Sequence, residues 1–195
     1  MKTRECDIVI VGVGGQGVIL LSNVIGISAL MAKLPVRGVE THGMAQRGGS
    51  VMNHLRIGCE LSPMIAAGSA DILLAMEPAE ALRFAHYLSK DGTAIVNTAP
   101  VHPITVTTGK SVYPPVAEIL EVLKRACKNV LTLDATSLAA IAGSPQTMNM
   151  VMLGALSKYI PLEEGTLFEA ISRSVPSRFL DVNRRAFELG KVEVE

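Results

Sequence analysis

A cluster of glycines follows the first apolar run of this chain. Residues 12–17, Gly-Val-Gly-Gly-Gln-Gly, match the spacing GxGxxG between a strand-like run (6–11) and a helix-like run (16–33). In that context, glycines let the backbone approach a pyrophosphate, and the free N–H groups at a helix N-terminus favour its charge. Glu40, at the expected end of the second strand, could hold a ribose. Three interpretations stay open: a dinucleotide site, a site for another phosphate-bearing ligand, or a tight turn whose glycines serve packing. The candidate ligand-binding residues here are Gly12, Gly14, Gly15, Gln16 and Gly17.

A polar segment at residues 42–49 is expected at the carboxyl ends of the strands, beside the glycine turn. It contains His42, Gln46, Arg47 and Gly48, which are further candidate binding residues. Ligands of open α/β sheets bind at this edge. Arg47 could hold a carboxylate or phosphate with two parallel hydrogen bonds, and His42 could exchange a proton with a bound group. Equally, Arg47 could make a salt bridge or a carbonyl contact at a subunit interface, and His42 could be a hydrogen-bonded loop residue.

An apolar helix is expected at residues 147–159. Asn149 begins it and could reach the same ligand edge. Met148, Met150 and Met152 indicate adaptable packing, and we expect the apolar patch that meets a partner at this helix or at the loop of residues 42–49.

The motifs of a self-contained catalytic centre are missing. The sequence has no GxSxG elbow, no P-loop and no zinc-ligand spacing among its four scattered histidines. Its three cysteines lie far apart, whereas an iron–sulfur cluster needs four organised thiolates. We therefore expect neither a catalytic residue nor a metal site on this chain alone.

Strand-like and helix-like runs alternate along the chain. We expect strands at residues 6–11, 36–40, 50–57, 72–76, 93–97, 104–108 and 130–134, the run at 104–108 being an edge strand. Helices are expected at residues 16–33, 77–87, 114–127, 135–142, 147–159, 163–175 and 177–189. Asp134 is expected to cap one helix, Gly190 to end the last, and His54 to lie on a partly exposed strand face. This pattern predicts a single-domain, three-layer, doubly wound α/β fold with a mostly parallel sheet and a helical C-terminal region.

Composition indicates a partner protein. The 195 residues carry 18 basic and 18 acidic side chains, a balance that argues against binding to nucleic acid or to an anionic membrane surface. Only 18% of residues are charged, against about 25% in an ordinary domain, while 49% are hydrophobic. Residues 18–32 are too short and too interrupted to span a bilayer. The polar first residues have no signal-peptide layout, and free thiols suit a reducing cytoplasm, where we expect the protein to act.

Four segments in order resemble one family over essentially the whole chain. They are GVGGQGVILLSNVIG (12–26), VETHGMAQRGGSVMNHLRIG (39–58), ADILLAMEPAEALR (70–83) and NMVMLGALSKYIP (149–161). Together they resemble the gamma-type domain of 2-oxoacid:ferredoxin oxidoreductases, so residues 1–195 are expected to form one pyruvate/ketoisovalerate oxidoreductase gamma-type catalytic domain. HGMAQRGGSV is most similar to the small beta subunit of the indolepyruvate type, because pyruvate-type members differ around Arg47.

The resemblance implies a small subunit that is inactive alone. The complex would decarboxylate a 2-oxoacid, here an aryl-pyruvate, and form an acyl-coenzyme A while reducing ferredoxin. Thiamine diphosphate, magnesium and iron–sulfur clusters would belong to a larger catalytic alpha subunit, and coenzyme A would be a co-substrate. The glycine turn and Arg47 then become candidate contacts to its phosphates. An isolated chain could also pair as a homodimer. The alternatives are a stand-alone NAD- or flavin-binding reductase and a purely structural subunit that binds no ligand.

Overall fold

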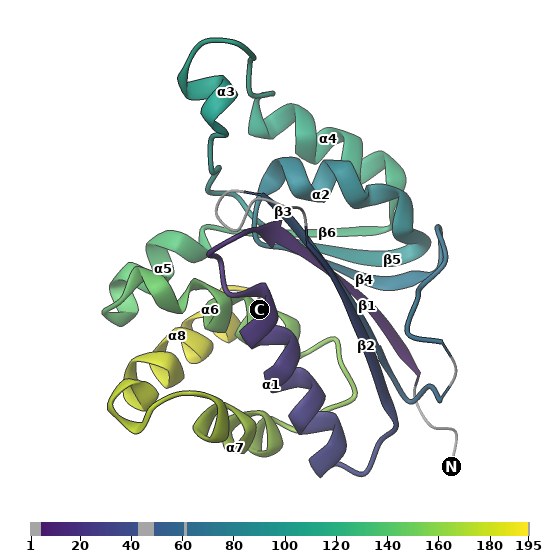
Figure 1. The fold of residues 1–195 in the computed structure, drawn as a ribbon, viewed down its shortest axis with the longest axis vertical. Helices are drawn as coiled ribbons and strands as arrows, with labels where there is room; N and C mark the ends of the chain where they lie inside the picture. The colour runs from purple at the N-terminus through teal and green to yellow at the C-terminus, as the bar shows by residue number, and fades with distance from the viewer. Residues whose placement is uncertain (1–4, 43–48, 61, 195) are drawn as a thin grey trace.

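A six-stranded mixed sheet runs through the protein (Figure 1). The computed structural model describes residues 5–42, 49–60 and 62–194. The strands are β1 (Cys6–Val13), β2 (Val36–His42), β3 (Ser50–Ile57), β4 (Ala70–Ala75), β5 (Leu88–Asn97) and β6 (Asn129–Leu133), in the order β2-β3-β1-β4-β5-β6. The pairs β1–β4, β4–β5 and β5–β6 are parallel, whereas β3 is antiparallel to β1 and β2. The expected mostly parallel sheet is confirmed.

Helices cover both faces of the sheet (Figure 1). One face carries α1 (Val18–Met31), α5 (Ala135–Ala142), α6 (Met148–Leu156), α7 (Glu164–Ser174) and α8 (Leu180–Glu193). The other carries α2 (Pro78–Phe84) and α4 (Val116–Ala126), with the short α3 (Ile104–Thr107) before α4. Single 3₁₀ turns occur at η1 (Ala85–Tyr87), η2 (Pro145–Thr147) and η3 (Ser177–Phe179). The expected three layers and helical C-terminal region are therefore present.

Strand β1 is apolar on both sides because helices bury both faces of the sheet. Ile8 and Ile10 belong to the larger core beneath α1 and α6, while Val9 and Val11 belong to the smaller core beneath α2 and α4. All four side chains are fully buried. Because β1 lies between β3 and β4 inside the sheet, its end, and so the glycine turn, lies in the middle of the sheet's carboxyl edge.

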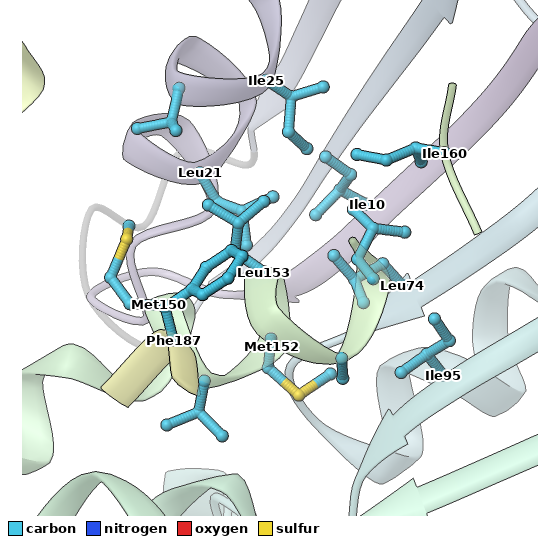
Figure 2. Packing of buried hydrophobic residues seen from close by; sticks show 14 of the residues in the cluster. Ile10, Leu21, Ile25, Leu74, Ile95, Met150, Met152, Leu153, Ile160 and Phe187 are labelled. Atoms are coloured by element: carbon cyan, nitrogen blue, oxygen red, sulfur yellow. The ribbon is translucent and has the colours of Figure 1, made fainter. Parts of the chain in front are cut away.

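The Met-rich helix α6 is the centre of the larger core rather than a partner surface. All nine of its residues are buried. Figure 2 shows Met150, Met152 and Leu153 of α6 in the same cluster as Ile10 of β1 and Phe187 of α8. The expectation of a partner-facing patch at this helix was wrong, because α1, α5, α8 and β5 pack around it within the chain.

Helices α6 and α8 approach closely at two glycines. A Cβ atom at Gly154 would overlap the carbonyl oxygen of Phe187, and one at Gly190 would overlap that of Val151. Gly190 therefore lies inside α8, which continues to Glu193, and the expected helix cap at Gly190 was wrong. Backbone contact between the helices explains both glycines.

Two further expectations differ from the structure. Residues Ile104–Thr107 form a single helical turn after Pro103, in which the Thr107 and Thr108 hydroxyls donate to the Ile104 carbonyl. Local hydrogen bonding thus outweighs the strand preference of β-branched residues. His54 is fully buried, because the loop after β3 covers it. Asp134, by contrast, caps α5 as expected by accepting from the Ser137 N–H.

Among the described residues, no helix combines the length and apolar character needed to cross a bilayer.

Candidate functional site

The glycine turn connects β1 to α1 at the carboxyl edge of the sheet. The Gln16 N–H donates to the Val13 carbonyl at 3.1 Å, and the Gly14 N–H donates to the Gly49 carbonyl at 2.8 Å. Gly15 and Gly17 have φ angles of 103° and 77°, a region that favours glycine. The turn therefore needs glycine at these two positions for its backbone shape alone.

The side chain of Gln16 folds back and closes the turn. Its Oε1 accepts from the Val13 N–H at 2.8 Å, and its Nε2 donates to the Met76 carbonyl at 3.0 Å. A Cβ atom at Gly12 would lie 2.8 Å from Gln16 Oε1 and 2.9 Å from Met76 Cβ. Gly12 thus makes room for Gln16, which ties β1 to the end of β4.

Asn149 closes the other side of the turn from the first residues of α6. Its Nδ2 donates to the Gly17 carbonyl at 3.3 Å, and the residue is only 3% exposed. A Cβ atom at Gly17 would clash with this amide. The sequence placed Asn149 at the ligand edge, and the structure brings it into contact with the glycine turn across 132 residues of chain.

The predicted site residues divide into three groups. Gly12, Gln16, Gly17 and Asn149 converge and contact one another. Gly14 and Gly15 lie at the surface of the turn, where Gly15 is exposed and a Cβ atom on it would meet nothing within 4 Å. His42 ends β2 opposite Val51. The candidates Gln46, Arg47 and Gly48 lie outside the described residues. Contact of any of these residues with a ligand stays a prediction.

Asn97, at the end of β5, makes hydrogen bonds to the segments that follow β4 and β6. Its Nδ2 donates to the Met76 carbonyl at 3.0 Å, the same oxygen that Gln16 contacts. Its Oδ1 accepts from the Ala135 N–H at 3.0 Å and from the Ala99 N–H at 3.3 Å. Asn97 is fully buried, so these bonds fix the ends of β4, β5 and β6 relative to the turn. Sequence reasoning missed this role, because the partners are backbone groups far away in the chain.

Two buried acids, Glu77 and Glu80, begin α2 beside the same edge. They are 2% and 4% exposed. Glu77 accepts from the Glu80 N–H as a helix cap, from the Val101 N–H, and from the hydroxyl of Tyr113. Glu80 accepts from the Ser50 hydroxyl at the start of β3. The sequence carried a signal for this cap, an acid directly before a helix-starting proline with a second glutamate three residues on.

Burial raises the pKa values of Glu80 and Tyr113. Desolvation raises the pKa of Glu80, and the hydrogen bond from Ser50 and the nearby Arg83 only partly oppose it. The pKa of Tyr113 is raised by burial and by its bond to the Glu77 carboxylate, so its hydroxyl remains a donor. These groups connect α2 and β3 through a fixed polar network.

The described residues do not fit a metal cluster. No group of three or more His, Cys, Asp or Glu side chains with ligating geometry occurs in the described part of the chain. Cys6, Cys59 and Cys127 are buried free thiols, and burial together with Asp71 and Asp7 raises the pKa of Cys6 to about 12. A thiol with so high a pKa is a poor source of the thiolate that binds iron.

The fold and this edge define a Rossmann-like α/β domain whose glycine turn is closed by its own side chains. The chain belongs to the family described as pyruvate ferredoxin/flavodoxin oxidoreductase, whose sequence model matches residues 7–192. It is 42% identical to indolepyruvate oxidoreductase subunit IorB of Archaeoglobus fulgidus over 186 residues, which cover 94% of this chain and 92% of that protein.

Solved structures share the fold. The gamma subunit of a keto/oxoacid ferredoxin oxidoreductase from Geobacter sulfurreducens superposes with a TM-score of 0.72 at 20% identity, covering 97% of this chain and 98% of that one. A 2-oxoglutarate:ferredoxin oxidoreductase from Magnetococcus marinus, solved with 2-oxoglutarate, coenzyme A and succinyl-CoA, superposes with a TM-score of 0.73 at 21% identity. That match covers 97% of this chain and 31% of the larger one.

Proposed function

We propose that this chain is the small subunit of a 2-oxoacid:ferredoxin oxidoreductase that acts on indolepyruvate or a related aryl-pyruvate. The observation that carries the proposal is the 42% identity to a subunit named for indolepyruvate, which extends over nearly the full length of both chains. The sequence HGMAQRGGSV, which we assign to the indolepyruvate type, supports the same subtype. Residues 1–195 would act as one gamma-type domain of a cytoplasmic complex.

The chemistry of decarboxylation and electron transfer would lie on a larger alpha subunit. That subunit would hold thiamine diphosphate with magnesium and the iron–sulfur clusters, and the complex would reduce ferredoxin. The scattered, buried cysteines of this chain are consistent with such a division, because their thiolates do not fit a cluster. This chain would support the assembly near the point where coenzyme A approaches.

The glycine turn is the part of this chain best suited to meet coenzyme A. Gly14 and Gly15 form its outer surface at the N-terminal end of α1, where backbone N–H groups favour a phosphate. Arg47 would add a planar cation to this site. The inner residues of the turn, Gln16 and Asn149, would keep its shape through their hydrogen bonds rather than contact the ligand.

Co-expression with the larger subunit tests this function. We expect the purified complex to reduce a viologen dye when given indolepyruvate and coenzyme A, and we expect this chain alone to reduce none. Aliphatic 2-oxoacids serve as the control for substrate class. Dye reduction by the lone chain, or a larger subunit that is fully active without it, would contradict the proposal.

A further inference from the structure

A groove of about 580 Å³ separates helix α1 from the edge strand β2. Figure 1 shows α1 running beside β2 at one margin of the sheet. The wall on α1 is formed by Ser22, Gly26 and Leu30, which share one face because they are four residues apart. The floor is β3, where Asn53 lies opposite Glu40 of β2. The described residues that line the groove include none of the glycine turn and none of the acid cluster at α2.

One end of the groove contains buried oxygens that lack hydrogen-bond partners. Ser22 is 4% exposed and Asn53 is 3% exposed, and neither Ser22 Oγ nor Asn53 Oδ1 has a hydrogen-bond partner among the residues that the structure describes. A buried acceptor without a donor is unfavourable, and native structures leave few of them. Both residues line the groove, but each oxygen is itself buried, so its side chain would have to turn toward a donor that enters from outside.

The same end is acidic. Among the described residues that line the groove, Glu40 is the only ionisable one, and it is exposed. Because Glu40 and Asn53 are directly paired across β2 and β3, their side chains are on the same face of the sheet. A carboxylate beside two neutral oxygens repels phosphates and carboxylates, and it matches the several N–H donors of a lysine or arginine side chain.

The other end of the groove is apolar and open. Leu30 is 65% exposed, although it faces the aliphatic side chains of Val36 and Leu55 across the groove. Between the two ends, a Cβ atom on Gly26 would meet nothing within 4 Å. An apolar side chain from another protein could cover Leu30 and remove this surface from water.

We propose that this groove receives a segment of the larger subunit, which places a lysine or arginine against Glu40, Asn53 and Ser22 and an apolar side chain against Leu30. The proposal rests on the proposed function for the existence of that partner. The carboxylate of Glu40 and the nearby unpaired oxygens favour a cationic side chain. The exposed Leu30, which lies beside aliphatic neighbours, favours an apolar one.

Filling the groove tests the proposal without harming the fold. Gly26→Leu adds a side chain where space is open, and replacing a helical glycine also favours the helix. Gly165→Leu is the matched control, because Gly165 is also helical with open space but lies in α7. Glu40→Arg reverses the charge of the groove, and Glu118→Arg on α4 reverses an exposed charge on the opposite side of the sheet.

Competition for the larger subunit measures the effect. Wild-type chain and one variant are co-expressed with the tagged larger subunit, and intact-mass spectrometry of the purified complex gives the ratio of the two chains. We expect Gly26→Leu and Glu40→Arg to be under-represented by about tenfold, since loss of a charge pair or central contact commonly weakens an interface by at least that factor. The two controls should appear at parity with the wild type.

The outcomes separate this proposal from the proposed function. A wild-type chain that does not bind the larger subunit would overturn both. Wild-type binding with Gly26→Leu and Glu40→Arg at parity would overturn the groove alone. The Tm of each variant is also measured on the free chain. A variant that keeps the wild-type Tm but loses the competition is weakened at the interface and is not misfolded.

Discussion

The amide of Asn149 donates to the carbonyl of Gly17, which joins the first turn of the central helix α6 to the glycine turn before α1. The bond connects the two halves of the chain at the edge where a ligand is expected. It also explains why Gly17 tolerates no side chain, because the amide occupies the space beside it.

Replacing Gly17 by alanine should destabilise the protein by about 1–3 kcal/mol, because the residue has a φ of 77° and its Cβ would displace Asn149. Urea unfolding measures the loss. Gly165→Ala is the control and should be neutral or slightly stabilising, since its Cβ meets nothing within 4 Å. Equal stability of the two variants would contradict the assigned contact.

Gly154→Ala should lower the free energy of unfolding further, by about 3 kcal/mol or more. The added Cβ would overlap the Phe187 carbonyl and force α6 away from α8. Gly26→Ala, in the open groove, should instead stabilise by about 0.5–1 kcal/mol. Thermal unfolding compares the two. A mild effect at Gly154 would show that the helices can separate at little cost.

Acid should weaken the fold through His54. Burial lowers its pKa below 6.5 in the folded state, so between the folded pKa and 6.5 the unfolded chain binds more protons. The contribution of neutral His54 is therefore complete above pH 6.5 and is lost as the pH falls. The free energy of unfolding of His54→Leu should depend less on pH between 5 and 7 than that of the wild type. Parallel pH curves would contradict this assignment.

Glu80 should have the opposite effect on stability: its ionisation should weaken the fold as the pH rises. Burial raises its pKa above the ordinary 4.5, so the folded state holds the proton more tightly. Its contribution to stability is complete below pH 4.5 and is lost as the pH rises through the raised pKa. Glu80→Gln keeps an acceptor for Ser50 but cannot ionise, and it should be as stable as the wild type or more so at pH 7. A marked loss of stability at pH 7 would show that the carboxylate itself is required.

Arg47→Ala should raise the apparent KM for coenzyme A by about tenfold in the reconstituted complex, as expected when a charged hydrogen bond to phosphate is removed. Assembly with the larger subunit should be unaffected. Arg37→Ala, an exposed arginine of β2, should leave the KM unchanged. An unchanged KM for Arg47→Ala would remove this residue from the proposed coenzyme A site.

Local sequence signals predicted most elements correctly where neighbouring residues decide the structure. The strand, glycine turn and helix at β1 and α1 follow from apolar runs on either side of the glycines, and the Asp134 cap follows from an acid placed before a helix. The run at 104–108 was misjudged, because its β-branched residues carry a strand preference that Pro103 and local hydroxyl bonds override.

The sequence alone determined the alternation of strands and helices, the glycine turn and the family to which the chain belongs. The tertiary structure decided what distant residues do to one another. Met150 is a core residue rather than an interface residue, Gly190 lies at a helix contact rather than a helix end, and Gln16 and Asn149 hold the turn. The reason is physical: periodicity reports which face of an element is apolar, but burial and hydrogen bonding depend on partners that folding brings together from far apart in the chain.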